Sequence, residues 1–237
     1  MKLVDRAIIR ALHLKPSDSA RVDERVFAVS CGYANFFVCR KEDAVIAIDT
    51  GPSKAAALRG MAAAGLNPAE ISRVFLTHTD FDHAGGLAAF PDAQVFFSED
   101  EEPLVAGKRT VRLYGLGRNR RIKRAYTLLS DGQTVSVGPL SVTALKTPGH
   151  TIGSMSYIVD GTLLFTGDAL CLHRGQAHPN PHFRMNDVAL RQSARRLAAL
   201  EGVSWLITAH SGWSPYRDAT ERLRAEPEQP GAGKNRS

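Results

Sequence analysis

Short apolar segments that each lead to a histidine or an aspartate constrain this 237-residue chain more than any other feature of its sequence. His78 follows the segment RVFLT, and His150 follows LSVTALKTPG. Asp168 follows TLLFTG, and His210 follows SWLITA. Short runs rich in Val, Ile, Thr and Phe predict β-strands. Four predicted strands therefore carry a potential metal ligand at or just beyond one end.

The segment LTHTDFDHAGG, residues 76–86, adds Asp80, Asp82 and His83 to these four. A single histidine at a strand end usually has a structural role, but four histidines and three aspartates in this arrangement indicate a metal site. Three ligands, a shared carboxylate and a water form a suitable shell for each of two divalent ions. Glycines beside the ligands allow the backbone to approach closely: Gly85, Gly86, Gly149 and Gly153.

The rest of the chain predicts strands and helices in two similar sets with no clear linker. We expect strands within 25–40, 43–51, 73–77, 93–99, 134–146, 155–168 and 203–210. We expect helices near the N-terminus and over 53–68, 85–90, 186–202 and 215–226. This pattern predicts one α/β (α+β) domain over residues 1–224, with sheets inside and helices outside.

Three local signals refine this prediction. Asp160 and Gly161 join two apolar runs and suit a tight type I′ hairpin turn. Asn186 is the expected N-cap of its helix, and Gly202 is the expected stop. Asp100 to Ser130 is the least regular segment, and residues 225–237 have the composition of a disordered tail.

Composition predicts a cytoplasmic protein. The chain is 43% hydrophobic and 23% charged, and it contains no run of about eighteen apolar residues that could span a membrane. Charged residues interrupt the apolar N-terminus, so no signal peptide is expected. Cys31, Cys39 and Cys171 form no disulfide framework and are expected to be buried free thiols in a reducing compartment.

Lys108 to Arg124 contains eight basic residues and no acidic one. The segment is either a solvated loop or a flexible lid that attracts an anionic small-molecule substrate. Sparse aromatic residues and the absence of a nucleic-acid motif argue against a nucleic-acid partner. The sequence does not indicate an oligomeric state.

The motifs HTDFDH, TPGHTIGS, FTGDAL and TAHSG resemble those of the metallo-β-lactamase superfamily, in order and over nearly the whole chain. The resemblance implies an αββα four-layer sandwich with two metals at one edge. It further implies one metal on His78, residue 80 and His150, a second on Asp82, His83 and His210, and Asp168 as the bridge.

Position 80 departs from the family pattern, because HxDxDH replaces a second histidine by Asp80. That histidine normally binds through Nδ1, which is two bonds from Cβ. An aspartate oxygen is also two bonds from Cβ, so Asp80 can reach the same metal. The alternative is a degenerate site that lacks this metal. The presence of the other six ligands is evidence against this alternative. A carboxylate favours harder metals, and flavodiiron proteins carry Glu here. Zinc is therefore the first choice, with iron and manganese open.

The resemblance implies hydrolysis of a small ester, lactone, thioester or phosphoester by a metal-bridging hydroxide, with Asp82 holding or moving a proton. Lactam hydrolysis is disfavoured, because classical zinc β-lactamases do not usually carry the bridging aspartate. Two other hypotheses remain. The chain could be a non-haem di-iron redox protein acting on oxygen, nitric oxide or a sulfur compound. It could also be a non-catalytic binding protein on the same fold.

Weaker candidates surround these residues. Asp49 is expected to support the metal loop through hydrogen bonds. Trp213 and Tyr216 follow His210, and packing is the favoured interpretation for both. Four residues of the loop after Asp168 are either pocket-lining or ordinary loop residues: Cys171, His173, His178 and His182.

Overall fold

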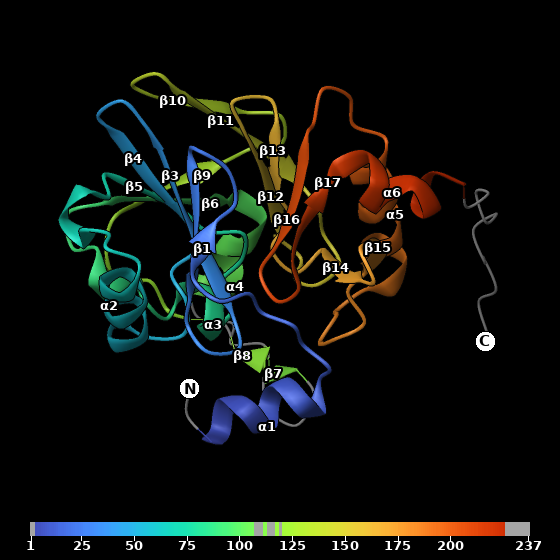
Figure 1. Cartoon of the computed structure of the whole chain (residues 1–237), viewed down its shortest axis with the longest axis horizontal. Helices are drawn as coiled ribbons and strands as arrows, with labels where there is room; N and C mark the ends of the chain where they lie inside the picture. Colours follow the sequence, from blue (N-terminus) through green and yellow to red (C-terminus); the bar gives the residue numbers. More distant parts are fainter. Residues whose placement is uncertain (1–2, 107–110, 113–116, 119, 226–237) are drawn as a thin grey trace.

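Two β-sheets face each other across a shared apolar core in the computed structural model, which describes residues 3–106, 111–112, 117–118 and 120–225. Helices cover the outer face of each sheet, so the layers run helix, sheet, sheet, helix (Figure 1). The predicted αββα sandwich is confirmed. No helix in the described part of the chain is long and apolar enough to cross a membrane.

The first sheet has seven strands in the order β1-β2-β3-β4-β5-β6-β9. Their bounds are β1 Ala20–Arg21, β2 Val26–Ser30, β3 Asn35–Lys41, β4 Ala44–Ile48, β5 Arg73–Phe75, β6 Gln94–Ser98 and β9 Tyr126–Leu129. The pairs from β1 to β4 are antiparallel, and the pairs from β4 to β9 are parallel.

The second sheet has six strands in the order β10-β11-β12-β13-β16-β17. Their bounds are β10 Thr134–Val137, β11 Leu140–Lys146, β12 Met155–Val159, β13 Leu163–Phe165, β16 Trp205–Thr208 and β17 Gly212–Pro215. Only the β13–β16 pair is parallel among these described strands. The chain passes from the first sheet to the second in the short connection 130–133, between β9 and β10.

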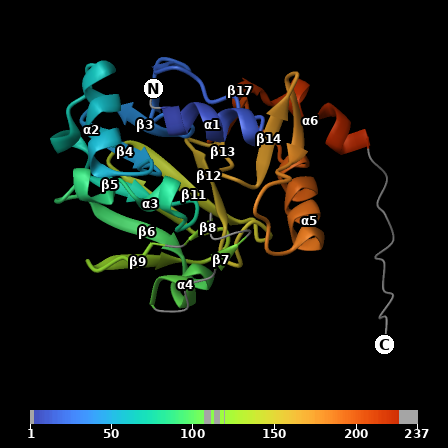
Figure 2. The same ribbon diagram turned by 90° about the horizontal axis from the view of Figure 1, so that it is seen from below.

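Helices α2 (Lys54–Ala63) and α3 (Phe81–Ala84) cover the first sheet, and α5 (Asp187–Ala198) and α6 (Tyr216–Ala225) cover the second. The helix α1 (Leu3–Ala11) lies across one end of the sandwich (Figure 2). The remaining elements are short: η1 Pro68–Glu70, η2 Leu87–Ala89, η3 Glu99–Glu101, α4 Glu102–Ala106 and the hairpins β7 Val111–Arg112/β8 Gly117–Arg118 and β14 Leu170–His173/β15 Gln176–Pro179.

The apolar strands are buried on both faces, which explains why their sequences are almost continuously hydrophobic. In β4, Ile46 and Ile48 face the core between the sheets, whereas Val45 and Ala47 face the helical layer. Successive side chains of a strand point to opposite faces. A strand that packs against the other sheet on one face and against a helix on the opposite face therefore has no solvent-exposed face that would need polar residues.

Two local predictions are confirmed. Asp160 and Gly161 have φ angles of 49° and 68°, as a type I′ turn requires at both central positions. Asn186 caps α5, because its side chain accepts a hydrogen bond from the Ala189 amide. The predicted stop was too late, since α5 ends at Ala198 rather than near Gly202.

Other boundaries differ from the predictions. Residues 25–40, expected as one strand, form β2 and β3, because the chain turns between Cys31 and Ala34. The helix expected over 85–90 contains only the single 3₁₀ turn η2. Residues 226–237 of the predicted disordered tail and eight of the seventeen residues of the basic segment Lys108 to Arg124 lie outside the described residues.

Candidate metal centre

All seven residues predicted as ligands come together at one edge of the sandwich. The first sheet supplies four from the loop and helix that follow β5: His78, Asp80, Asp82 and His83. The second sheet supplies three from the ends of β11, β13 and β16: His150, Asp168 and His210. Because each strand stops at the same edge, residues far apart in the sequence become neighbours.

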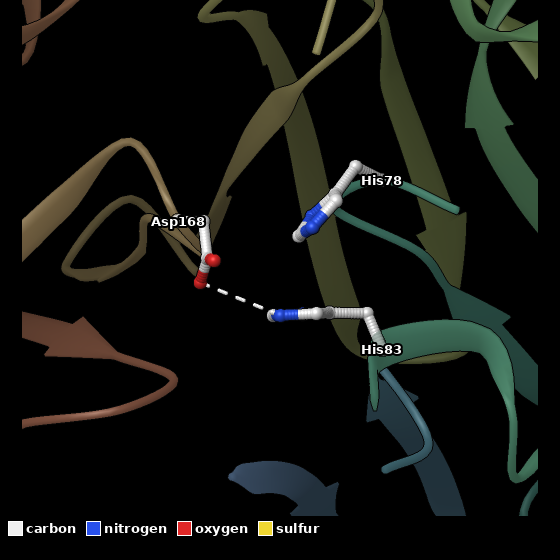
Figure 3. A group of neighbouring side chains, drawn as sticks. All are labelled: His78, His83 and Asp168. Carbon is white, nitrogen blue, oxygen red and sulfur yellow. Dashed lines mark ion pairs between the residues drawn. The ribbon is translucent and has the colours of Figure 1, made fainter. Parts of the chain in front are cut away.

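The side chains form three groups whose potential ligand atoms lie within 4.8 Å of one another. One group is His78, Asp80 and His150, and another is Asp82, His83 and His210. The third is His78, His83 and Asp168, which point toward a common centre (Figure 3). The first two groups are the sets that the family resemblance implies for two separate metals.

Asp168 lies between those two groups. Its Oδ1 is 3.4 Å from Nε2 of His83 and 3.2 Å from Nε2 of His210. Its Oδ2 is 3.4 Å from Nε2 of His150. One oxygen thus faces each group, which is the arrangement that a shared carboxylate requires.

Asp80 directs its carboxylate toward the histidines instead of toward the helix that it starts. Its Oδ2 is 3.3 Å from Nε2 of His150 and 3.6 Å from Nε2 of His78. Asp80 is the N-cap residue of α3, yet its side chain makes no capping hydrogen bond. Aspartate is normally favoured at this position for that bond, so the observed orientation has its cause in the centre.

Hydrogen bonds to Nδ1 orient three of the imidazoles. Nδ1 of His83 is 2.8 Å from Oδ2 of Asp49. Nδ1 of His210 is 2.8 Å from the carbonyl oxygen of Tyr33. Nδ1 of His150 is 3.2 Å from the carbonyl oxygen of His182. These contacts leave each Nε2 directed into the centre, as in metal-binding histidines.

Asp49 supports the loop as predicted. Its Oδ1 accepts a hydrogen bond from the Thr77 amide at 2.8 Å, while its Oδ2 faces His83. Its φ angle is 63°, a conformation that Asp and Asn tolerate better than most residues. The carboxylate therefore holds both ends of the segment that carries four of the seven side chains.

Glu101 is a structural residue that the sequence analysis missed. It is fully buried, and its Oε1 accepts hydrogen bonds from the amide and the hydroxyl of Thr79, at 2.9 and 2.8 Å. Its Oε2 accepts from the Thr151 hydroxyl at 2.7 Å and from the Gly153 amide at 3.2 Å. The carboxylate thus joins the loops of the two sheets. Its place in the acidic run EDEE gave no signal of this role.

The electrostatics suit a cation site. Burial opposes ionisation of Asp168, but the imidazoles of His210, His83 and His150 outweigh it and hold its pKa well below the usual range. Burial and the neighbouring imidazoles of His83 and His150 hold the pKa of His78 well below its usual value. His78 is thereby held in the neutral form that binds a metal. At His83 and His210 burial is outweighed, and the neighbouring carboxylates of Asp49 and Asp168 raise the pKa instead.

The donor set also fits a metal by hydrogen-bond accounting. Within the described part of the chain, the buried Nε2 atoms of His78 and His83 have no hydrogen-bond partner. Buried polar atoms without partners are rare because desolvation is costly. Two nitrogens of this kind, surrounded by carboxylates, match a site for divalent cations.

The weaker candidates separate into two groups. His182 lines a cavity at the centre, whereas Tyr216 is buried and donates its hydroxyl to the carbonyls of Leu197 and Leu200. Trp213 packs against the core between the sheets. The packing interpretation of Trp213 and Tyr216 is confirmed.

The loop after Asp168 contains a hairpin that was not predicted. Its strands β14 and β15 carry Cys171, His173 and His178, which line a second cavity beside the centre. Burial raises the pKa of the Cys171 thiol to about 11. Among the described residues, Cys31 and Cys39 are buried free thiols, as predicted, whereas Cys171 is a free thiol that is only partly buried.

The chain matches the family model of the metallo-beta-lactamase superfamily over residues 29–228. YobT of Bacillus subtilis (strain 168) is 31% identical over 176 residues, which cover 65% of this chain and 72% of that protein. A hydroxyacylglutathione hydrolase of Hahella chejuensis is 31% identical over 140 residues, 58% of this chain. The chain spans only 47% of the length of that hydrolase.

A solved structure described as a B3 metallo-beta-lactamase with an active-site glutamic acid has a TM-score of 0.69 to this chain. The two chains are 23% identical, and the match covers 94% of this chain and 92% of that chain. This likeness shows the fold alone. The chain therefore belongs to the metallo-β-lactamase superfamily.

Proposed function

We propose that the centre binds two divalent metal ions and that the chain hydrolyses a small ester, thioester, lactone or phosphoester. His78, Asp80 and His150 would hold one ion, Asp82, His83 and His210 the other, and Asp168 both. The observation that carries this proposal is the convergence of seven potential ligands around buried Nε2 atoms that lack hydrogen-bond partners. Seven ligands are too many for one ion of ordinary coordination number.

Two divalent ions in such a site would lower the pKa of a water molecule and polarise the bond that it attacks. The chain's own contribution is to fix the geometry. Glu101 and Asp49 hold the ligand loops, and Asp168 would keep the two ions at a constant separation. Positioning of this kind reduces the reorganisation needed at the moment of reaction.

Asp82 is the residue that we propose to hold or move a proton during turnover. Its Oδ2 is 3.5 Å from Nε2 of His210 and 3.9 Å from Nε2 of His83. Its side chain is 15% exposed, against 6% for Asp80 and 9% for Asp168. Asp80, Asp82 and Asp168 all line the cavity, and the greater exposure of Asp82 makes it the carboxylate best placed to meet a leaving group.

The similarity to a hydroxyacylglutathione hydrolase supports a thioester among the candidate substrates. The nitrogen and oxygen donors suit zinc, and the additional carboxylate of Asp80 also suits iron or manganese. An anionic substrate is part of the proposal because the segment Lys108 to Arg124 contains eight basic residues and no acidic one.

The first experiment is to purify the chain without added metal, measure its metals and record an absorption spectrum. The metal-loaded protein is then assayed with matched ester, thioester, lactone and phosphodiester substrates. Two ions per chain and hydrolysis that a chelator abolishes and added metal restores would support the proposal. One ion per chain, or two with no hydrolysis, would contradict it. An iron spectrum that changes with oxygen or nitric oxide would favour the redox alternative, which Asp80 motivates.

A further inference from the structure

The helix α1 lies across one end of the sandwich (Figures 1 and 2), and Ile8, Ala11 and Leu12, at and just beyond its C-terminal end, line the cavity at the candidate metal centre. None of the residues of α1 is fully buried, and Leu3 is 84% exposed. The chain just after the helix is attached to the centre, because the Lys15 amide donates a 2.8 Å hydrogen bond to the carbonyl of His210. The helix is therefore fixed at its C-terminal end and supported by few buried contacts.

The cavity at the centre has two chemically different sides. One side consists of potential metal ligands, including Asp82 and His210. The other side is apolar and is formed by Ile8, Leu12 and Leu14 from α1 and its extension, together with the rings of Tyr33, Phe81 and Phe183. A ligand in this cavity would place one part against the ions and another part against hydrocarbon.

Phe183 shows that the apolar side is held at a conformational cost. Its φ angle is 52°, in a region that bulky side chains rarely adopt. It directly follows His182, whose carbonyl oxygen accepts the hydrogen bond from His150. Strained residues of this kind concentrate at binding sites. The strain thus occurs where the metal side and the apolar side of the cavity meet.

We infer that α1 and its extension form a specificity wall, and that the substrate carries a compact apolar acyl or aryl group next to its scissile bond. This inference rests on the proposed hydrolytic function and names its substrate class. Ile8 and Leu12 are half-buried and line the cavity, so an apolar group beside them would remove more of their surface from water and stabilise α1.

The size of the cavity limits that group. Its volume is about 150 Å³, and an engineered cavity of roughly this size, lined by Leu, Ile and Phe, accommodates benzene. A six-carbon ring or a chain of about six carbons should therefore fill it. Burial of each methylene should raise kcat/KM about fourfold, equivalent to about 0.8 kcal/mol. Longer chains should bring no further gain.

The test uses the metal-loaded full chain and a series of esters or thioesters with one leaving group and acyl chains from two carbons upward. We expect kcat/KM to rise with chain length and to level off near six carbons. Hydrogen exchange gives a second readout that needs no turnover. Hexanoate should slow exchange of the amides of residues 3–14, and acetate should not.

Variants identify the wall. The double variant Ile8→Ser, Leu12→Ser should flatten the dependence on chain length, and Leu12→Trp should shift the preference toward acetyl substrates by filling the cavity. Leu3→Ser makes the same chemical change at an exposed position of the same helix and should preserve the wild-type dependence. If Leu3→Ser flattens it as strongly as the double variant, the wall is not where we place it.

The two proposals fail in different ways. Hydrolysis with equal kcat/KM for all chain lengths, and without hexanoate protection of residues 3–14, would overturn the specificity wall and leave the proposed function intact. No hydrolysis of any substrate, with selective protection by hexanoate, would overturn the proposed function and support an apolar binding site beneath α1.

Discussion

Oδ2 of Asp49 lies 2.8 Å from Nδ1 of His83, and the other oxygen of the same carboxylate accepts the Thr77 amide. We predict that Asp49→Asn weakens metal binding by roughly 10- to 100-fold, the usual effect of losing such a partner. Asparagine keeps the size and tolerates the positive φ, so the backbone is undisturbed. Its NH₂ group replaces an oxygen that now faces a donor, so the charge and a buried hydrogen bond are lost together. Chelator competition measures the affinity. Asp43→Asn, at an exposed aspartate, is the control and should change nothing.

Asp80 should be a working ligand that influences the choice of metal. With Asp80 the ligand set carries three carboxylates, and with histidine it would carry two. Asp80→His should therefore shift the preference toward zinc and lower the pH at which hydrolysis begins. Asp80→Ala should reduce the metal content from two ions to one and remove nearly all activity. Full activity with two ions in Asp80→Ala would show that Asp80 is not a ligand.

Glu101 should contribute both to the stability of the fold and to metal binding at the centre. Glu101→Gln places an NH₂ group where a carboxylate oxygen now accepts a donor, so one buried hydrogen bond must be lost. We expect the free energy of unfolding to fall by about 1–3 kcal/mol, with weaker metal binding in parallel. Urea unfolding and metal titration measure the two effects. Glu201→Gln, on an exposed loop, is the matched control, and equal stability of the two variants would contradict the role of Glu101.

Asp160 should make stability depend on pH. Burial raises its pKa, but the Ser141 amide, Lys41 and Arg25 outweigh burial and hold the pKa below its ordinary value of 3.8. A carboxyl whose pKa is lower in the folded than in the unfolded chain stabilises the fold at a pH above its unfolded-state pKa. This stabilisation is lost as the pH falls through its folded-state pKa. Asp160→Asn should thus be less stable by roughly 1 kcal/mol at pH 7, a modest effect because Lys41 is 40% exposed.

Thermal or urea unfolding at a series of pH values tests this prediction. The difference between Asp160→Asn and the wild type should remain constant from pH 7 to about pH 5 and shrink below about pH 4. Asparagine also accepts the positive φ of this turn position, so the backbone change is small. A difference that persists unchanged at pH 2.5 would assign the effect to the turn and not to the charge.

The family motifs implied the αββα layers, and strong local signals predicted the seven clustered residues. Apolar strands that lead to His150, Asp168 and His210 place these side chains at the strand ends whatever the details of the packing. The turn at Asp160 and the cap at Asn186 depend on neighbouring residues alone, and both were predicted correctly.

The missed features depend on contacts between distant segments. Glu101 joins loops that are 22 and 50 residues away in the sequence, and no local pattern distinguishes it from its acidic neighbours. Ile8 belongs to the helix that was predicted near the N-terminus, and Leu12 directly follows it, but the surface that they cover was not predicted. The hairpin β14–β15 ends in Pro179 and is followed by Pro181, and proline is uncommon in strands, so this segment was predicted as a loop.

The short connection 130–133 has a practical consequence, because it divides the chain at the boundary between the two sheets. A cut there would give one fragment with His78, Asp80, Asp82 and His83 and another with His150, Asp168 and His210. Neither fragment would hold a complete ligand set. Hydrolytic activity regained on mixing the two would therefore report their reassociation, and the chain could serve as a split reporter whose signal requires both halves.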